Sequence, residues 1–411
     1  MRRAVAVVLA ALVASAAFAQ TTLTVGVFEP LHLHIERMIE RWHALYPDVN
    51  LEIRGLGYGD HHDALVTQLA TGSGAPDVVA IEIGYIARFI ADGGLRDLSA
   101  APFNADRYED RFVDYAWNQA RSNDGRQIAL PTDIGPGVMW YRRDRLEASG
   151  WTIEQVTESM QSLIEFGRDL KEQGVFLIAD AGTVAGAFIR SDIPEGDGIY
   201  FNAAGEPQLN SERFVQAATY AKMIRDEGLD ARIGSWSNEW YENFRLGTSA
   251  IEMSGAWLGG HLANWMAPET AGQWGVSELP GGMLLSWGGS FYGIPTTTPE
   301  NKLEAAWNLV QFLTVDPEIA LEAFTFNDAF PALPETYGNA VFQEALPFLG
   351  GQQARLLYGD VAQRIPGVAT FTADVIAQEM WDSALAEILN EGRDIQEALD
   401  EAQSLVQRRL R

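Results

Sequence analysis

The sequence predicts an α/β protein built of two lobes, and three observations lead to this prediction. The chain has 411 residues, 47% of them hydrophobic, which is more than one hydrophobic core usually supports. Residues 22–83 alternate between β-branched runs and helical periodicity. The stretch from Leu130 to Asp144 then interrupts this periodicity with closely spaced prolines and glycines, which is typical of a crossing between lobes.

The elements of the first lobe follow from periodicity and turn residues. Residues 22–28 are predicted to form the first strand, which Glu29-Pro30 ends. Residues 49–53 and 78–83 are predicted to form two further strands, and the helix between them ends at the glycines of 72–74. Strand, helix, strand, helix, strand is the beginning of a doubly wound sheet with right-handed crossovers.

The remaining chain is predicted to alternate in the same way. The expected helices cover residues 108–120, 153–173, 211–227, 299–313, a segment after Asp316-Pro317, and 394–410. The expected strands cover residues 127–131, 175–178, 249–253 and 274–279. Residues 327–334, with two prolines, indicate a further crossing.

The stretch from Trp236 to Trp257 is predicted to organise the second lobe. Asn238 is a plausible N-cap for a short helix that Gly247 ends. Gly255 allows a tight turn after the next strand and directly before Trp257. An aromatic side chain just past a strand end lies at the mouth of an α/β sheet, where ligands bind.

The first residues predict export. Arg2 and Arg3 precede an apolar run, and Ala17-Phe18-Ala19 matches a cleavage site, so residues 1–19 are predicted to be a cleaved signal peptide. The apolar run is too short to span a bilayer. The chain has no cysteine, hence no disulfide and no lipid-modified N-terminal cysteine. We therefore expect a monomeric periplasmic or extracytoplasmic protein without a lipid anchor.

The charge of the chain restricts its partners. A formal net charge of −27 repels nucleic acid and anionic membrane surfaces. It favours an uncharged or cationic ligand, although solubility alone also explains it. No nucleic acid partner is expected.

Four segments together resemble a known family. They are Pro76 to Leu98, with P-D-V-V and G-G-L-x-D-L; Leu130 to Asp144, ending in Y-x-x-D; Phe244 to Trp257, with F-x-x-G-x-x-A-I-x-x-x-G-x-W; and Ser286 to Pro295. These motifs resemble those of the family 1 extracellular solute-binding proteins, which deliver sugars to ABC importers. The resemblance covers nearly the whole mature chain.

The resemblance implies a two-lobed periplasmic-binding-protein fold of type II-like form. Each lobe would hold a mainly parallel sheet flanked by helices, with three hinge crossings. The N-terminal lobe would comprise residues 20–130 and 290–328, and the C-terminal lobe residues 131–289 and 329–411. Such a protein closes by hinge motion around a neutral sugar or oligosaccharide and delivers it to the membrane permease. It needs no cofactor and is not an enzyme.

The predicted site combines flat aromatic rings with carboxylates, because a sugar has apolar C–H faces and a rim of hydroxyls. Six of the twelve tryptophans lie within residues 236–287. The predicted ligand-binding residues are Glu29, Glu82, Tyr85, Asp133, Trp236, Trp257, Trp287 and Phe371. By resemblance, Glu29 and Asp133 align with ligand-contacting positions of the family.

Each of these residues also has a structural alternative. Glu29 could cap the next helix, Glu82 could be a solvated strand end, and Asp133 could stabilise the hinge. The tryptophans could belong to the core. Trp257 in particular is expected either to stack on a sugar or to pack in the interior.

Two other functions are open from the sequence. A metal-ion or other small-solute receptor of the same fold could use histidines, but His32 and His34 do not share a helix face, and neighbouring His61 and His62 cannot readily share one metal. His61 could instead donate to a sugar hydroxyl. A glycoside-active enzyme would need two opposed carboxylates, which the sequence cannot select. We expect no metal site and no catalytic residues.

Overall fold

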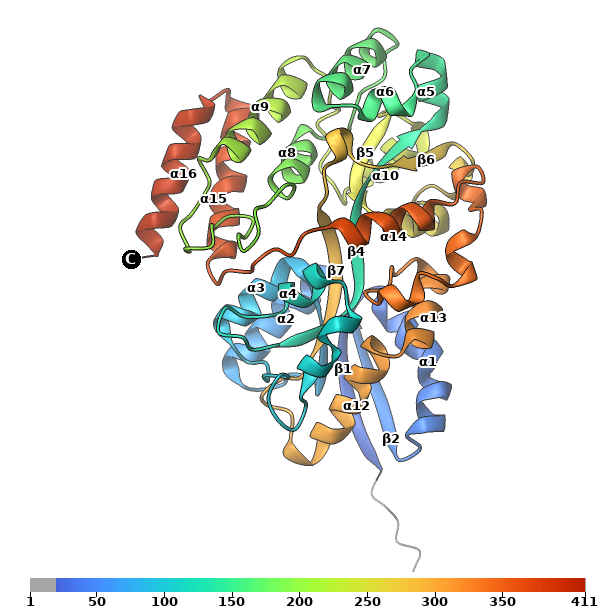
Figure 1. The fold of residues 1–411 in the computed structure, drawn as a ribbon, viewed down its shortest axis with the longest axis vertical. Helices are drawn as coiled ribbons and strands as arrows, with labels where there is room; N and C mark the ends of the chain where they lie inside the picture. The colour runs from blue at the N-terminus through green and yellow to red at the C-terminus, as the bar shows by residue number, and fades with distance from the viewer. Residues whose placement is uncertain (1–19, 411) are drawn as a thin grey trace, which may run out of the picture.

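The computed structural model describes residues 20–410, so the predicted signal peptide of residues 1–19 lies outside the described residues. The chain forms two lobes that long strands join (Figure 1). One seven-stranded sheet runs through both lobes in the order β2-β1-β3-β7-β4-β5, with β6 paired to β4. The mixed α/β, two-lobed fold class is therefore confirmed.

The first lobe begins with alternating strands and helices, as predicted. These elements are β1 (Thr21–Phe28), α1 (Leu31–Leu45), β2 (Val49–Leu56), α2 (Tyr58–Thr71), β3 (Val78–Glu82) and α3 (Ile83–Asp92). Strand β1 pairs in parallel with both β2 and β3. Helix α2 ends at Gly72, whose φ of 65° places it in the left-handed region that glycine enters without steric cost. The carboxyl ends of the three strands therefore meet at one edge of the sheet.

Two strands connect the lobes. They are β4 (Ala129–Arg142) and β7 (Ser286–Gly293), which pair antiparallel; in Figure 1, β4 runs from the lower lobe to the upper one and β7 runs back. The strand predicted at 127–131 is longer than expected, because β4 continues through the predicted crossing as far as Arg142. Its prolines are accommodated by register shifts between Pro131 and Asp133 and between Ile134 and Pro136. Proline has no N–H for the ladder and is tolerated at such irregularities.

The sheet of the second lobe differs from the expected mainly parallel arrangement. Strands β5 (Ile251–Gly255) and β6 (Trp274–Ser277) both pair antiparallel with β4. The predicted strand at 175–178 contributes two isolated parallel bridges, from Phe176 to Ser249 and from Ile178 to Asp230. Strand propensity did not reveal that the long crossing strand β4 would pair with both β5 and β6.

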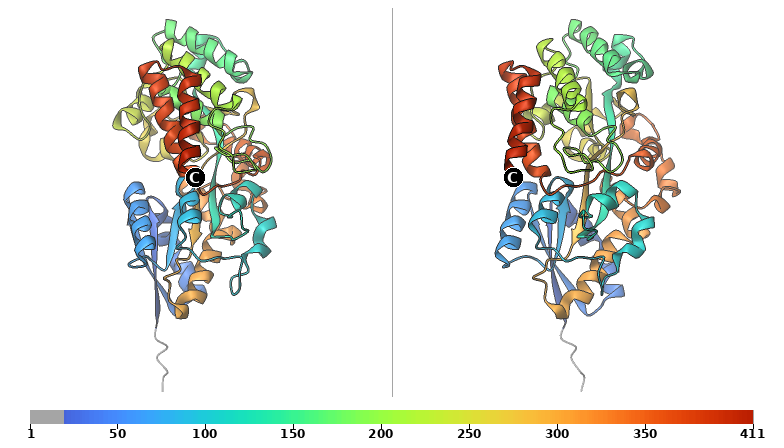
Figure 2. Two further views of the ribbon diagram at one scale, coloured as in Figure 1. Left: turned by 90° about the vertical axis from the view of Figure 1, so that its left-hand side faces the viewer. Right: turned by 60° about the vertical axis from the view of Figure 1, so that its left-hand side comes forward.

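Helices cover both lobes, as the two turned views in Figure 2 show. Those after α3 are α4 (Asp114–Gln119), α5 (Arg143–Ser149), α6 (Ile153–Thr157), α7 (Met160–Glu172), α8 (Ala181–Ile189), α9 (Glu212–Asp226), α10 (Asn238–Leu246), α11 (Leu258–His261), α12 (Leu303–Thr314), α13 (Pro317–Asn327), α14 (Ala354–Arg364), α15 (Asp374–Ala386) and α16 (Ile395–Arg409). Within residues 20–410, none of the helices has the length and apolar character that a membrane span requires.

A third segment runs beside the two crossing strands. The backbone of Ile134 donates to the carbonyl of Phe330 at 2.8 Å, and Asp133 forms a bridge with Pro331. The predicted crossing at 327–334 therefore lies next to β4. Boundaries of the lobes at residues 130, 289 and 328 stay predictions.

Buried side chains form one core in the second lobe and two that include first-lobe strands. One cluster joins β1 and α1 to α12 and also includes Phe244 and Trp274 of the second lobe. A second cluster packs α7, α8 and α9 against β5 and Trp381. A small third cluster lies between α3 and β3. The largest core thus extends across the two lobes.

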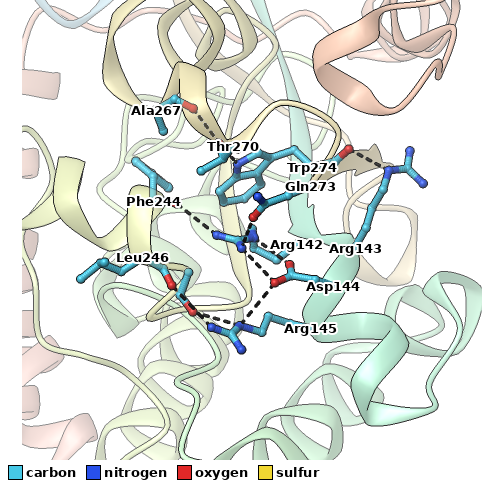
Figure 3. A network of polar contacts seen from close by, with 11 residues as sticks. Arg142, Arg143, Asp144, Arg145, Phe244, Leu246, Ala267, Thr270, Gln273 and Trp274 are labelled. Carbon is cyan, nitrogen blue, oxygen red and sulfur yellow. Dashed lines mark hydrogen bonds and ion pairs between the residues drawn. The ribbon is translucent and has the colours of Figure 1, made fainter.

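A polar network fixes the far end of β4 in the second lobe (Figure 3). Arg142 is buried and donates to both carboxylate oxygens of Asp144, at 2.8 and 2.9 Å, and to the carbonyl of Phe244 at 3.2 Å. Its guanidinium lies 5.5 Å from the ring of Trp274, whose indole N–H donates to Thr270. These contacts join β4 to the C-terminal end of α10, and so position the segment that leads to Trp257.

Candidate functional site

Glu82 lies at the carboxyl edge of the first-lobe sheet, where β3 ends and α3 begins. Its Oε2 accepts hydrogen bonds from the backbone N–H of Gly84 at 2.7 Å and from the hydroxyl of Tyr58 at 2.8 Å. Burial raises the pKa of Glu82 to about 7, although these two bonds lower it. Both bonds are made to Oε2, and Oε1 accepts no hydrogen bond from the described residues. The expected solvated strand end is in fact a helix cap.

His62 holds the backbone of Glu82 in place. The backbone N–H of Glu82 donates to its Nε2 at 3.1 Å, so the ring proton is on Nδ1, which donates to the carbonyl of Tyr58 at 2.7 Å. Tyr85 stacks on the same imidazole, with ring centroids 4.0 Å apart. Burial lowers the pKa of His62 to about 4, which keeps this arrangement neutral.

His61 is engaged within the first lobe, and the expectation that it donates to a sugar hydroxyl stays a prediction. It is buried, and its Nε2 lies 2.8 Å from the carbonyl oxygen of Ala80. The side chain therefore holds α2 to β3. Over residues 20–410, no three His, Asp or Glu side chains converge in a way that could hold a metal ion.

Asp133 lies on β4 between the two other crossing segments. It is opposite Ser290 of β7 on one side and Pro331 on the other. Burial raises the pKa of Asp133 to about 6, partly offset by the hydroxyl of Ser290. Among the described residues, its buried Oδ1 has no hydrogen-bond partner. A buried acceptor without a donor is costly unless a ligand supplies one.

Trp287 and Trp257 meet where the crossing strands converge. The indole N–H of Trp257 donates to the carbonyl of Trp287 at 2.7 Å. A Cβ atom at Gly135 would lie 1.9 Å from that same carbonyl oxygen, so only glycine allows β4 to approach so closely. Trp257 is half-buried and packs against the largest core, while its role in ligand binding stays a prediction.

Trp236 covers one face of Trp257. The two indoles are stacked, with centroids 5.6 Å apart and planes inclined by 17°. Trp236 has a φ of 64°, which is rare for a bulky residue, and its side chain is 53% exposed. Strained backbone of this kind is concentrated at functional sites. The free outer face of Trp236 is therefore available for stacking.

A cavity of about 270 Å³ lies in the second lobe beside these rings. Its lining includes Trp287, Arg190 at the end of α8, Gly234, Ser235 and Asp382 of α15. The guanidinium of Arg190 is 5.3 Å from the ring of Trp287 and donates to the carbonyl of Gly186 at 2.8 Å. Its charge also acts on Glu82 in the first lobe. The residues that line the cavity come from segments 180–287 and 381–385, which the sequence assigns to the second lobe.

Sequence reasoning missed Arg190, Tyr58 and Ser290. A single arginine at the end of an apolar helix carries no local signal, and Tyr58 and Ser290 become relevant only through the neighbours that the sheet gives them.

The remaining two candidates, Glu29 and Phe371, lie outside the lining of the cavity. Glu29 is exposed at the end of β1, and the structure places it on the same sheet edge as Glu82. Phe371 is half-buried and packs 5.4 Å from the ring of Phe201, at the edge of the second-lobe core. Their role in binding stays a prediction.

A second cavity, of about 560 Å³, lies between α4 and the segment 366–370. Its lining consists of charged, polar and small side chains, including Asn118, Arg121 and Glu195. Its chemistry therefore differs from that of the aromatic cavity.

Two lobes joined by three adjacent segments, with an aromatic cavity in the second lobe and a carboxylate at the sheet edge of the first, form the architecture of proteins that bind a small solute between two lobes. The model of the family described as bacterial extracellular solute-binding protein matches residues 34–319. The chain belongs to this family.

Curated relatives agree with this membership. The arabinooligosaccharide-binding protein of Bacillus subtilis is 25% identical over 268 residues, which cover 64% of this chain and 61% of that relative. The lactose-binding protein of Rhizobium radiobacter is 25% identical over 345 residues, covering 80% of this chain and 78% of the relative. Both are named as binding proteins, which fits a protein that is not an enzyme.

Solved structures show the same fold. An extracellular solute-binding protein of family 1 has a TM-score of 0.82 at 24% identity, covering 94% of this chain and 99% of the other. The sugar-binding protein MalE of Xanthomonas citri has a TM-score of 0.75 at 17% identity, covering 94% and 96%.

Proposed function

We propose that this protein binds a neutral sugar or oligosaccharide between its lobes and delivers it to the membrane permease of an ABC importer. The observation that carries the proposal is the combination, at one site, of indole rings with two largely enclosed carboxylates that each have a free oxygen. Trp236 and Trp287 offer flat apolar surfaces, while Glu82 and Asp133 offer acceptors for hydroxyl groups. The names of the curated relatives support the same class of ligand.

The fold supports a binding mechanism by closure. Glu82 belongs to the first lobe and Arg190 to the second, and the crossing segments, contacts between α3 and α15, and a hydrogen bond from Thr370 to the carbonyl of Gln119 connect their surroundings. Rotation about β4, β7 and the segment 330–332 would bring the two sets of groups onto a sugar. The protein would act outside the cytoplasm as a monomer without a lipid anchor.

Thermal unfolding with a sugar panel tests this function. The panel should contain arabinose, lactose, and arabino-, malto- and galacto-oligosaccharides, with zinc chloride and amino acids as controls. A sugar at a hundredfold excess over its dissociation constant is expected to stabilise the protein by about 2.7 kcal/mol. Chromatography of the sugar after incubation should show no hydrolysis. Stabilisation by zinc or an amino acid, with no response to any sugar, would contradict the proposal.

Asp133→Asn is expected to weaken sugar binding by about 1.5–3 kcal/mol, the usual contribution of a hydrogen bond to a charged group. The fold should not lose stability, because the substitution removes a buried charge whose Oδ1 has no partner among the described residues. Isothermal titration calorimetry and thermal unfolding of the same variant measure the two quantities. Asp48→Asn, exposed just before β2 at the opposite edge of the sheet, is the matched control. Equal affinities for the two variants would remove Asp133 from the site.

A further inference from the structure

Aromatic side chains continue from the site onto the outer surface of the second lobe. Trp236, stacked on Trp257, lies edge to face with His261 at a centroid distance of 5.8 Å. His261 in turn lies edge to face with Trp265 at 5.6 Å. We call Trp236, His261 and Trp265 the aromatic row. The imidazole of His261 thus contacts both indoles and joins Trp236 to Trp265.

The row is unusual for a surface. The side chains of Trp236 and Trp265 are 53% and 46% exposed, although tryptophan is among the most apolar residues by area. Trp265 lies in a single π-helical turn, Leu262–Met266, which directly follows α11. Such turns and positive φ values, like that of Trp236, are both frequent at functional sites.

The rings of the row are held in place before any ligand arrives. The indole N–H of Trp265 donates to Nδ1 of His261 at 2.9 Å. Nδ1 is therefore an acceptor, and the proton of the neutral imidazole is on Nε2, where it can donate to a hydroxyl. Burial lowers the pKa of His261 to about 4, which preserves this tautomer at neutral pH. The row thus has apolar faces with one fixed donor between them.

The row begins one residue along the chain from the lining of the cavity. Gly234 and Ser235 line the cavity, and Trp236 is the next residue along the chain. The cavity, of about 270 Å³, is at the lower end of the size range of ligand sites. A sugar chain longer than the cavity would therefore leave it along Trp236.

We propose that the aromatic row is an extension site that binds the outer units of an oligosaccharide whose end lies in the cavity. This rests on the proposed function and adds that the ligand is a chain longer than the cavity. Its apolar faces and neutral donor suit sugar rings, and pre-ordered rings lower the entropy cost of binding.

The test is affinity as a function of chain length. Calorimetry should compare wild type, Trp265→Ala, Trp265→Tyr and the control Phe326→Ala, using arabino-, malto- and galacto-oligosaccharides of two to six units. Phe326 is an exposed aromatic residue of α13 in the first lobe. Trp265→Ala is expected to lose about tenfold affinity for the longest chain that binds and to keep wild-type affinity for the disaccharide. Trp265→Tyr should recover most of the loss, and Phe326→Ala should match wild type at every length.

Several results would overturn the proposal. A loss by Trp265→Ala that is equal at all lengths, or no loss at any length, would remove the row from binding while leaving sugar binding in the cavity intact. Self-association of the wild type that Trp265→Ala abolishes, with unchanged sugar affinities, would assign the row to a contact between copies. Failure of wild type to bind any sugar would overturn the proposed function together with the extension site.

Discussion

Trp257→Ala is expected to lower the free energy of unfolding by about 2–3 kcal/mol and to weaken sugar binding by about 2–4 kcal/mol. The loss of stability follows from its packing against the largest core and from its hydrogen bond to the carbonyl of Trp287. Without the indole, that carbonyl loses a donor at the point where the lobes join, and Trp236 loses the ring on which it is stacked. Chemical unfolding and calorimetry on one preparation measure both effects.

Trp236→Ala is the matched comparison, because Trp236 is the outer ring of the same stacked pair. It is expected to weaken binding by a similar amount, while stability changes by less than about 0.5 kcal/mol, as for most surface positions. Replacement of Trp236, whose φ is 64°, by a residue with a smaller side chain should not add backbone strain. If Trp257→Ala lost stability but bound sugar normally, Trp257 would be a core residue and the outer tryptophan alone would remain as a stacking surface.

Much of the fold could be predicted because local signals agreed with it. The N-cap of α10 is Ser237, one residue before the predicted Asn238, and Gly247 ends the helix in the left-handed region, as expected. Helices α13 and α16 begin close to their predicted starts, and the side chains of Asp316 and Asp394 cap them. Strand direction in the second lobe was not predictable, because β5 and β6 pair with a strand that enters from the other lobe.

The site was only partly accessible from the sequence. Glu82, Asp133 and the tryptophans could be selected because a carboxylate or an aromatic ring at a strand end has a recognisable place in an α/β fold. Arg190 and Tyr58 could not, since their relation to Glu82 depends on how two distant segments pack. The aromatic row was missed for a related reason. The sequence does not show that the π-helical turn leaves the side chain of Trp265 46% exposed.

Glu252, on β5 beneath the aromatic residues, is a buried carboxyl group that sequence reasoning also did not select. It is 1% exposed, accepts from the indole N–H of Trp240 at 3.1 Å and from the backbone N–H of Met253 at 3.2 Å. Burial raises the pKa of Glu252 to about 8, and the charge of Asp180 adds to this, while the two hydrogen bonds lower it. Trp240 in turn contacts Trp236, so Glu252 is linked through Trp240 to the outer tryptophan of the stacked pair.

Glu252 is expected to make the protein less stable as the pH rises from about 4.5 to about 8. In this interval the carboxyl keeps its proton in the folded state and loses it in the unfolded state, so the folded state binds more protons and the free energy of unfolding falls with pH. The slope is at most about 1.36 kcal/mol per pH unit, and it ends above the folded pKa.

Glu252→Gln should abolish this component, which chemical unfolding at several pH values would measure as a difference from wild type that grows toward pH 8. Trp240→Phe removes a donor to the carboxylate of Glu252, so in this variant the fall in the free energy of unfolding should continue to higher pH. Parallel curves for wild type and Glu252→Gln would show that the buried carboxyl titrates alike in the folded and unfolded chains.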